Sequence, residues 1–479
     1  MPTAWVHFNA QRKAAGQELL ALTADRSGTL RATWLDPSDG RQTWMDWGVS
    51  GGRFPSLSVV LPEVAWDERE IHDLFGYLPE GHPDLRPLVR TPRWPTTFLP
   101  LGGSRRPPLW REVEPDLPAL QVQGEGVTIM KVGPTHAGII ESGHFVFSLI
   151  GENILHLDVH LFQNHRGLET LLEGETLDAV PRVVGRTCAA DTVSHQTNWA
   201  LAVEHLSDFT APPALTRQRV VLLEAERVLS HLNDLAQIPA GVGFQVAHQR
   251  ALSIKEYWQR CLKALFGHRF LFDTVRPGWA KATSGEALVE AVRGLRQRFG
   301  PWRRLVEGHV GFQDRMRGVG VTSLSQVIRL GAQGVAARAA GKPFDARQML
   351  PWYGEFEVKP VTGVEGDVKA RFMVRLEELE ESLRILEAAA PRLPASPPRP
   401  AYFALPPDPS GRVVTFTESP HGLNVHDVTL ESGRVVRYHI RAATFRNWPL
   451  LAQAVGGNAV ADFPLINKSF ELCYSCTDR

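Results

Sequence analysis

Two long segments of the chain repeat their apolar residues every third or fourth position, which is the spacing of one buried helix face. Residues 217–235 (RQRVVLLEAERVLSHLNDL) follow this pattern, and residues 370–389 follow it more regularly. The second segment carries a single apolar stripe, made of Phe372, Leu376, Leu379, Leu383 and Leu386. The spacing therefore predicts a helix over each segment, with one face packed in the core.

Other segments alternate short apolar runs with turn residues, which is typical of strands. Near the start, residues 19–37 and 55–62 are predicted as short strands in a small α+β unit. Near the end, residues 411–420 and 432–442 are predicted to pair as strands. A helix is expected after them, around Trp448–Val455.

Two proline-rich stretches divide the chain, over residues 91–117 and 391–409. Their prolines and glycines are too frequent for a regular helix or strand. The first stretch separates the small α+β unit from a mostly helical region, and the second separates the helix at 370–389 from the β-rich tail. We predict an α+β protein with a small N-terminal domain and a mostly helical second domain carrying minor β hairpins.

Composition narrows the class of protein. The chain has 479 residues, with 52 Lys and Arg against 52 Asp and Glu, so its formal net charge is zero. A broad nucleic-acid surface would show as a basic excess, and nucleic acid is therefore not an expected partner. The apolar runs are too short to cross a bilayer. The first residues lack the order of a signal peptide, which favours a cytoplasmic location.

The four cysteines are too few for a disulfide framework. Cys261 stands alone in a helical pattern and is interpreted as a small buried apolar residue. Cys473 and Cys476 form a CxxC close to the C-terminus, and Cys188 follows Arg-Thr. In a reducing compartment a CxxC indicates metal binding or redox activity before a structural bond.

Residues 66–90 (WDEREIHDLFGYLPEGHPDLRPLVR) combine a charged helix start with an aromatic turn and a Gly-His-Pro-Asp loop. This segment resembles the signature of the C-type subunit of NADH:quinone oxidoreductase (complex I). In that family the module holds no cofactor and docks against its neighbours. The resemblance implies a structural or interface role for Glu68, Arg69, Asp73, His82 and Asp84.

From Gly133 onward the chain resembles the large subunit of group 4 NiFe hydrogenases, especially the formate hydrogenlyase type, and the related complex I D-type subunit. The motifs, in family order, are GPTHAGIIESGHF (133–145), NHRGLE (164–169), GRTCAADTVSH (185–195), ERVLSHL (226–232), GDVKAR (366–371), RAATFRNWP (441–449) and SFELCYSCTDR (469–479). The two resemblances imply a docking domain over residues 1–100, a proline-rich connection over 101–118, and a hydrogenase-like domain over 119–479.

The family's metal centre takes four thiolates from two motifs, two of which bridge nickel and iron. Here Cys188, Cys473 and Cys476 match three of these ligands, while Asp191 stands where the family has a bridging cysteine. The resemblance implies nickel and iron as cofactors, but a carboxylate oxygen is a hard ligand that suits zinc or iron better than hydride chemistry. We therefore expect an altered or lost NiFe site, and an active hydrogen-evolving site is the alternative.

Two further positions bear on this chemistry. His421 replaces the arginine that lies beside the iron ligands in the family, and histidine need not carry the charge that arginine keeps. Glu141 matches the glutamate that passes protons to and from a nickel thiolate. The matching histidines His165, His195 and His231 are expected to make structural hydrogen bonds near the pocket.

The complex I relative suggests a quinone pocket as a second alternative. Its quinone head meets a histidine pair four residues apart and a tyrosine. In this chain His136 matches the first histidine, but Ile140 stands at the second position and Gln163 replaces the tyrosine. A pocket can persist without those polar groups, because fold and cavity are separable from particular side chains.

The resemblance also implies an assembly. The chain is expected to couple electron transfer from an iron–sulfur small subunit to a membrane arm, within a formate hydrogenlyase-like complex. Other iron–sulfur subunits and antiporter-like membrane subunits are its expected neighbours. Its expected location is peripheral, on the cytoplasmic side of the inner membrane.

Overall fold

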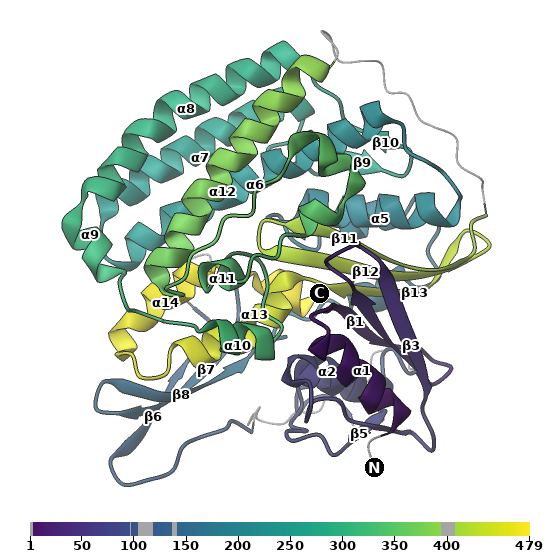
Figure 1. Cartoon of the computed structure of the whole chain (residues 1–479). Helices are drawn as coiled ribbons and strands as arrows, with labels where there is room; N and C mark the ends of the chain where they lie inside the picture. Colours follow the sequence, from purple (N-terminus) through teal and green to yellow (C-terminus); the bar gives the residue numbers. More distant parts are fainter. Residues whose placement is uncertain (1–2, 96, 104–117, 137–140, 394–407) are drawn as a thin grey trace.

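The computed structural model describes residues 3–95, 97–103, 118–136, 141–393 and 408–479. Figure 1 shows long helices at the top, a three-stranded sheet across the middle, and the N-terminal unit below that sheet. The mixed α+β class predicted from the sequence is confirmed. Most of the proline-rich residues lie outside the described ranges, and the domain boundaries at 100 and 118 stay predictions.

The N-terminal unit places a helix on a three-stranded antiparallel meander. Its elements are α1 (Ala4–Ala14), β1 (Glu18–Ala24), β2 (Thr29–Leu35) and β3 (Gln42–Gly48), in the order β1-β2-β3. The side chains of Trp5 and Trp34 are fully buried at the centre of this unit. The strands predicted over residues 19–37 are confirmed as β1 and β2.

The strand predicted over residues 55–62 is wrong. The short strand β4 (Arg53–Pro55) ends there and pairs in parallel with β5 (Leu78–Glu80). The chain then turns and enters helix α2 (Ala65–Phe75). The carboxylate of Glu68, on this helix, stabilises the turn, because it accepts hydrogen bonds from Ser56 Oγ and Leu57 N, both at 2.6 Å. Val59 and Val60 are exposed in this turn, so these two apolar residues do not belong to the buried face of a strand.

A second antiparallel sheet projects from the lower edge of the molecule. It contains β6 (Val127–Val132), β7 (His144–Ile150) and β8 (Asn153–His160), in that order. Phe145 and Phe147 of β7 pack edge-on against Phe463, with ring centroids 5.4 and 4.9 Å apart. These aromatic contacts hold the sheet against the C-terminal helices.

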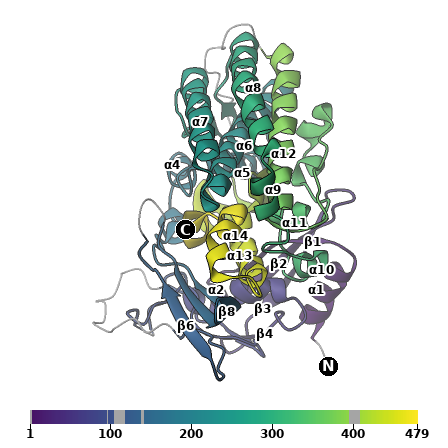
Figure 2. The same ribbon diagram turned by 90° about the vertical axis from the view of Figure 1, so that its left-hand side faces the viewer.

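Five long helices form the upper layer: α5 (Thr192–Leu206), α6 (Pro213–Gly241), α7 (Gln245–Phe266), α8 (Gly285–Gly308) and α12 (Val368–Ala389). Figures 1 and 2 show α6, α7, α8 and α12 side by side. The helices predicted at 217–235 and 370–389 are confirmed within α6 and α12. The predicted apolar stripe of α12 is fully buried, and so are Arg371, Arg375 and Glu378 on its other sides.

The C-terminal sheet consists of β11 (Gly411–Ser419), β12 (Gly422–Glu431) and β13 (Arg434–Arg441). The prediction that residues 411–420 pair with 432–442 is wrong, because both strands pair with β12 instead. Strand β12 is buried on both faces, between α5 and the strand β1 of the N-terminal unit. Both faces carry buried polar residues, among them Asn424, His426 and Asp427, so β12 is not the continuous apolar run expected of a strand covered on both sides.

Shorter elements complete the chain: α3 (Leu168–Leu172), α4 (Val180–Val184), β9 (Val275–Arg276), β10 (Trp279–Ala280), α9 (Val310–Arg315), α10 (Leu324–Arg329), α11 (Gly334–Ala339), α13 (Ala443–Ala454), α14 (Phe463–Phe470) and α15 (Tyr474–Asp478), together with the 3-10 turns Pro62–Val64, Ala346–Met349, Pro351–Phe356, Ala390–Arg392 and Val460–Asp462. Helix α13 confirms the helix predicted around Trp448–Val455 and begins earlier. Among the described residues, no helix is long and apolar enough to cross a membrane.

Candidate functional site

The two cysteines of the CxxC meet a third cysteine, nearly three hundred residues earlier in the sequence, where α15 approaches the loop between α4 and α5. The sulfur atoms of Cys188, Cys473 and Cys476 all lie within 4.8 Å of one another, and Cys188 Sγ is 3.2 Å from Cys473 Sγ. Cys188 and Cys476 are buried, and Cys473 is half-buried. We call these three residues the thiol pocket. Cys261, on α7, lies outside this group; it packs against the hydrophobic core as a partly buried residue, less buried than predicted.

Backbone amides point at the sulfur atoms. Ala190 N donates to Cys188 Sγ at 3.2 Å, and Cys476 N donates to Cys473 Sγ at 3.3 Å across the first turn of α15. Hydrogen bonds from Cys188, Cys476 and Ser475 lower the pKa of Cys473 well below its usual value. Its role as the acceptor favours a thiolate at Cys473, because hydrogen bonds to the charged form stabilise it.

Asp191 and His421 form a buried ion pair beside the thiol pocket. His421 Nδ1 lies 3.0 and 3.2 Å from the two carboxylate oxygens of Asp191, which is 1% exposed. Cys476 Sγ lies 3.5 Å from Asp191 Oδ2. Burial opposes a charge on His421, yet the Asp191 carboxylate raises the His421 pKa to about 10. The two residues that depart from the family motifs therefore contact each other.

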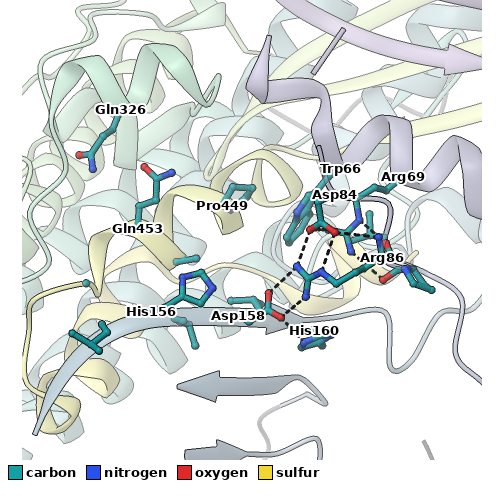
Figure 3. A pocket seen from close by; sticks show the side chains of 17 residues that line it. Trp66, Arg69, Asp84, Arg86, His156, Asp158, His160, Gln326, Pro449 and Gln453 are labelled. Atoms are coloured by element: carbon teal, nitrogen blue, oxygen red, sulfur yellow. Dashed lines mark hydrogen bonds and ion pairs between the residues drawn. The ribbon is translucent and has the colours of Figure 1, made fainter. Parts of the chain in front are cut away.

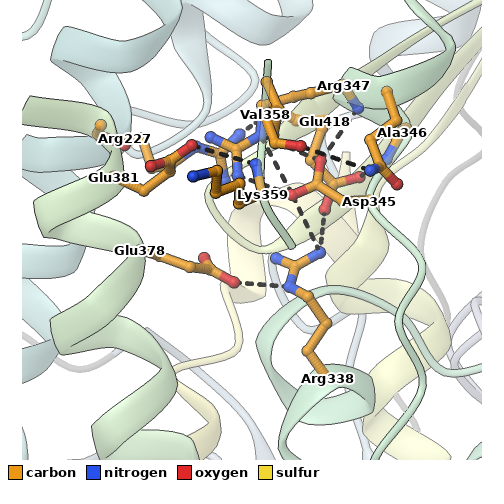
Figure 4. Close-up of polar contacts among 12 residues, drawn as sticks. Arg227, Arg338, Asp345, Ala346, Arg347, Val358, Lys359, Glu378, Glu381 and Glu418 are labelled. Carbon is orange, nitrogen blue, oxygen red and sulfur yellow. Dashed lines mark hydrogen bonds and ion pairs between the residues drawn. The ribbon is translucent and has the colours of Figure 1, made fainter. Parts of the chain in front are cut away.

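A buried ionic network holds the turn that carries His421 (Figure 4). Arg227 of α6 donates to the carbonyl oxygens of Ser419 and Glu418, at 3.0 and 2.7 Å. Arg338 of α11 binds the carboxylates of Glu378 and Glu418, at 2.6 and 2.7 Å. The end of β11, two residues before His421, is thereby fixed from two helices.

Comparison with known proteins identifies the lineage. The family model described as "Respiratory-chain NADH dehydrogenase, 49 Kd subunit" matches residues 242–407 and 401–479, and the 30 Kd subunit model of the same enzyme matches residues 44–103. Hydrogenase-4 component G of Escherichia coli (strain K12) is 31% identical over 439 residues, which cover 89% of this chain and 76% of the relative. Formate hydrogenlyase subunit 5 of the same organism is 30% identical, over 89% of this chain and 77% of the relative.

The chain belongs to the group 4 hydrogenase large-subunit family. Like other members of this family it is a subunit of an oxidoreductase complex, with a C-type segment ahead of the large-subunit part. A C/D fusion protein of NADH-quinone oxidoreductase from Aquifex aeolicus (strain VF5) is 25% identical over 98% of this chain and 88% of the relative.

A solved structure supports the fold of this family member. The match is to a chain of the membrane-bound sulfane sulfur reductase (MBS), an archaeal respiratory membrane complex, with a TM-score of 0.68. It covers 74% of this chain and 99% of that chain, at 22% identity. At that identity the likeness establishes the fold and nothing about the chemistry.

Glu141, the predicted proton carrier of the hydrogenase family, contacts the first turn of α15. Its Oε2 atom accepts a hydrogen bond from Ser475 N at 2.8 Å, between the two cysteines of the CxxC. Burial raises the pKa of Glu141, and the negative charge of Cys473 raises it further. Glu141 therefore lies next to the CxxC, and its role as a proton carrier stays a prediction.

The predicted quinone-pocket residues bind backbone close to their own positions. His136 Nε2 lies 2.8 Å from Gly143 O, and Gln163 Nε2 donates to Leu161 O at 3.4 Å. Ile140 lies outside the described residues. The structure gives His136 and Gln163 local partners and does not show them facing one another.

The histidines within the family motifs make hydrogen bonds, as predicted. His195 Nδ1 lies 2.9 Å from His426 Nε2, and His231 Nε2 lies 2.9 Å from the Glu378 carboxylate. His165 Nδ1 lies 2.5 Å from the carbonyl oxygen of Asp478. None of the three rings reaches a sulfur of the thiol pocket through these contacts, so their observed role is structural.

The acidic residues of the predicted docking motif stabilise loops of their own module. Glu68 fixes the turn after β4, as described above, and Asp73 accepts hydrogen bonds from the backbone N–H groups of Leu88, Val89 and Arg90. Burial raises the pKa of Glu68 to about 7. These two carboxylates therefore act inside the module.

The rest of the docking motif reaches the second sheet. Arg69 donates to the carbonyl oxygen of Arg86, and His82 Nδ1 accepts from Asp84 N. Arg86 binds Asp84 at 2.7 Å and Asp158 of β8 at 2.6 Å, beside a cavity of about 510 Å³ (Figure 3). The contact with Asp158 joins the N-terminal module to the hydrogenase-like part.

Sequence reasoning missed a second buried cluster, where the C-terminus meets the N-terminal module. Arg479 binds Glu70 of α2 at 2.6 Å and Glu169 of α3 at 2.8 Å, and His439 Nδ1 lies 3.2 Å from Glu169. We call these four residues the C-terminal ion cluster. Glu70 lies within the motif EREIHDLFG and Glu169 within NHRGLE. Their place in these family motifs is the one sequence feature that could have pointed to the cluster.

Proposed function

We propose that the chain is a group 4 large subunit whose NiFe chemistry is lost, and that it couples electron transfer from an iron–sulfur partner subunit to a membrane arm. The observation that carries this proposal is the Asp191–His421 ion pair. It occupies the positions where the family has a bridging thiolate and an arginine. The two residues that differ from the family motifs therefore contact each other beside the thiol pocket.

The donor set does not fit a NiFe centre. A centre that cycles through redox states and binds hydride needs soft thiolates, and the family supplies four. Here the fourth position offers a hard carboxylate oxygen, already paired with His421 at 3.0 Å. Three sulfurs remain within 4.8 Å of one another, close enough to bind a single metal ion. This set has one ligand fewer than the four thiolates of the family pattern.

The redox and membrane parts of the proposal rest on the relatives. They include a protein named "Membrane-bound hydrogenase subunit alpha" from Pyrococcus furiosus, 29% identical over 72% of this chain. By that relationship, the partners of this chain are an iron–sulfur small subunit, other iron–sulfur subunits and antiporter-like membrane subunits. The chain would then lie at the cytoplasmic face of the inner membrane.

The proposal is tested by the metal content of the native complex, purified with its partner subunits. We expect neither nickel nor the infrared bands of iron-bound CO and cyanide. About one nickel per chain together with those bands would contradict the proposal and support the alternative, an active hydrogen-evolving subunit. Binding of a quinone analogue that protects His136 from labelling, and that is weakened by Gln163→Ala, would favour the second alternative, a quinone-site subunit.

A gain-of-ligand variant sharpens the test. The double substitution Asp191→Cys with His421→Arg restores both family residues. If the ion pair is what excludes the NiFe centre, this variant takes up nickel when produced with nickel maturation proteins, and the unaltered chain does not. Cys261→Ser serves as the matched control for changes in cysteine number, because Cys261 lies outside the pocket.

A further inference from the structure

A cavity of about 540 Å³ lies between the N-terminal module and the large-subunit part of the chain. One wall is a face of the sheet β1-β2-β3, and the opposite wall is formed by β11 and the end of α5. The described residues that line it include none of the thiol pocket. Small-molecule pockets have volumes of about 300–1,000 Å³ and occur preferentially at domain interfaces. This cavity fits that description in both respects.

Aromatic side chains from four segments line this cavity, which we call the aromatic cavity. They are Trp44 of β3, Phe209 after α5, Trp352 of the 3-10 turn Pro351–Phe356, and Phe416 of β11. Trp44 is 57% exposed, so its indole ring is open to contact. Aromatic rings pack well against other rings in stacked or edge-on arrangements. The walls therefore favour a ligand with a flat aromatic ring.

Two arginines present unused donors to the same cavity. Arg31 of β2 binds Asp46 through Nε and Nη2, at 2.5 and 2.6 Å, and Arg412 of β11 binds Asp427 in the same way, at 2.9 and 2.6 Å. Both arginines line the cavity, whereas Asp46 and Asp427 are not among its described lining residues. Nη1 of each arginine has no hydrogen-bond partner in the part of the chain that the structure describes. The aspartates therefore hold the guanidinium groups in place and leave one edge of each free.

The two guanidinium groups approach the same part of the sheet. Arg412 Nη2 donates to Thr23 Oγ1 at 2.7 Å, and Thr23 lies directly opposite Arg31 in the ladder between β1 and β2. Residues directly opposite in an antiparallel pair have Cβ atoms about 4.5–5.5 Å apart on one face. Two arginines in one place favour a carboxylate, because a guanidinium group matches its two oxygens in geometry and charge.

The acidic residue of the lining is already paired. Glu204 of α5 is 3% exposed, and Arg219 binds its two carboxylate oxygens at 2.5 and 2.8 Å. Gly278 N donates to the same carboxylate at 2.7 Å. Glu204 is therefore occupied by its own partners and does not take up the free edges of the two arginines.

Thr33 adds a buried hydroxyl group to this wall. Its side chain lies on the cavity face of the sheet, because Thr33 is opposite Trp44 in the ladder between β2 and β3 and two residues from Arg31. Thr33 is 2% exposed, and no described residue forms a hydrogen bond with its Oγ1. Buried polar groups normally have a hydrogen-bond partner, so this hydroxyl indicates that one is missing.

We propose that the aromatic cavity binds a planar aromatic carboxylate. The aromatic side chains pack against the ring of the ligand, and Nη1 of Arg31 and of Arg412 donate to its carboxylate oxygens. Thr33 Oγ1 donates to the same carboxylate and so gains its missing partner. Binding of this ligand joins the two parts of the chain and involves no residue of the thiol pocket.

Photolabelling of the full chain in its native complex tests the proposal. Benzoylbenzoate is an aromatic carboxylate that forms a covalent bond with nearby side chains under illumination, and its amide lacks the charge. We expect saturable labelling of β3, the 3-10 turn Pro351–Phe356 or β11 by the acid, and at least tenfold less by the amide. Excess naphthoate should compete with the label, and cyclohexanecarboxylate, which has no aromatic ring, should compete at least tenfold less well.

Three variants locate the site. Trp44→Ala removes one wall at an exposed position and should weaken competition by naphthoate about tenfold. Thr33→Val keeps the shape and removes one hydrogen bond, so it should weaken competition about three- to tenfold without lowering the melting temperature. Thr43→Val is the matched control, because Thr43 Oγ1 is also buried without a partner among the described residues but does not line the cavity. This control should compete like the unaltered chain.

Several results would overturn the proposal. Equal labelling by the acid and its amide would show that the arginines do not select a carboxylate. Equal competition in Thr33→Val and Thr43→Val would show that the cavity hydroxyl meets no ligand. Labelling of the isolated chain that disappears in the native complex would show that a partner subunit covers the cavity. Metal content decides the proposed function and labelling decides this inference, so the two can fail separately.

Discussion

The thiol pocket and the C-terminal ion cluster are two buried groups of potential metal ligands with different partners. In each, three ligand-type side chains bring their donor atoms within 4.8 Å: Cys188, Cys473 and Cys476 in one, and Glu70, Glu169 and His439 in the other. Both lie close to α15, and each joins segments more than two hundred residues apart. The two groups differ in whether positively charged side chains of the protein bind their potential ligand atoms directly.

The C-terminal ion cluster is neutralised by the protein itself. Arg479 binds both carboxylates, Arg437 lies 2.9 Å from Glu169, and Arg441 lies 3.2 Å from Glu70. Burial opposes ionisation of Glu70, but Arg479 and Arg441 lower its pKa to about 2. A divalent cation would have to displace these guanidinium groups, so the cluster is not a metal site.

The sulfurs of the thiol pocket have no such direct cationic partners among the residues that the structure describes. His421 binds Asp191 beside the pocket, and Arg166 binds the carbonyl oxygens of Thr187 and Ser475 next to the cysteines. Closeness of ligand-type atoms is thus shared by both groups. The comparison teaches that arginines neutralise the carboxylates of one group directly, whereas the cations near the other bind its surroundings.

The largest expected effect is loss of the arginine in the C-terminal ion cluster. Arg479→Met leaves Glu70 and Glu169 buried with too little positive charge, and breaking such a buried pair costs about 3–5 kcal/mol. Urea denaturation of the purified protein at pH 7 would measure this. A loss below about 1 kcal/mol, the size of an exposed pair, would show that Arg437 and Arg441 neutralise the carboxylates without Arg479.

The second effect is a dependence on acid pH in the same cluster. The pKa of Glu70 falls from 4.5 to about 2 on folding, so its stabilising contribution is present above pH 4.5 and is lost as the pH falls toward 2. The shift corresponds to about 3 kcal/mol.

Glu70→Gln isolates this contribution, because glutamine keeps the shape and cannot ionise. The unaltered protein should be more stable than the variant at pH 7, and the difference should shrink as the pH drops from 5 to 2. Denaturation curves at several pH values measure the difference. A gap that stays constant over that range would contradict the assigned pKa shift.

The smallest effect is expected at the surface, beside the thiol pocket. Arg186, two residues before Cys188, binds Asp273 at 2.7 Å, and both side chains are more than one third exposed. Exposed ion pairs contribute about 0.2–1 kcal/mol. Asp273→Asn should therefore change the unfolding free energy by less than about 1 kcal/mol. A larger loss would show that this pair holds the cysteine loop in place.

The sequence predicted α12 from the spacing of its apolar stripe, and β1 and β2 from apolar runs bounded by turn residues. It missed β12, whose buried positions mix apolar and polar residues. It also predicted a strand at Val59 and Val60, which are apolar but exposed.

The site was predictable to the extent that family motifs marked it. Departures from those motifs singled out Asp191 and His421, but their contact joins residues 230 positions apart and follows only from the fold. Arg479 and Glu70 lie 409 positions apart, and no local pattern signals such a contact. Long-range ion pairs are therefore the part of the site that the sequence alone leaves open.

The central claim is that this chain has lost the NiFe centre of its family, because the Asp191–His421 ion pair occupies two positions that the centre needs. X-ray absorption of the native complex at the nickel edge tests it most directly. The account predicts no nickel edge. A nickel edge with sulfur neighbours and iron close by would contradict it.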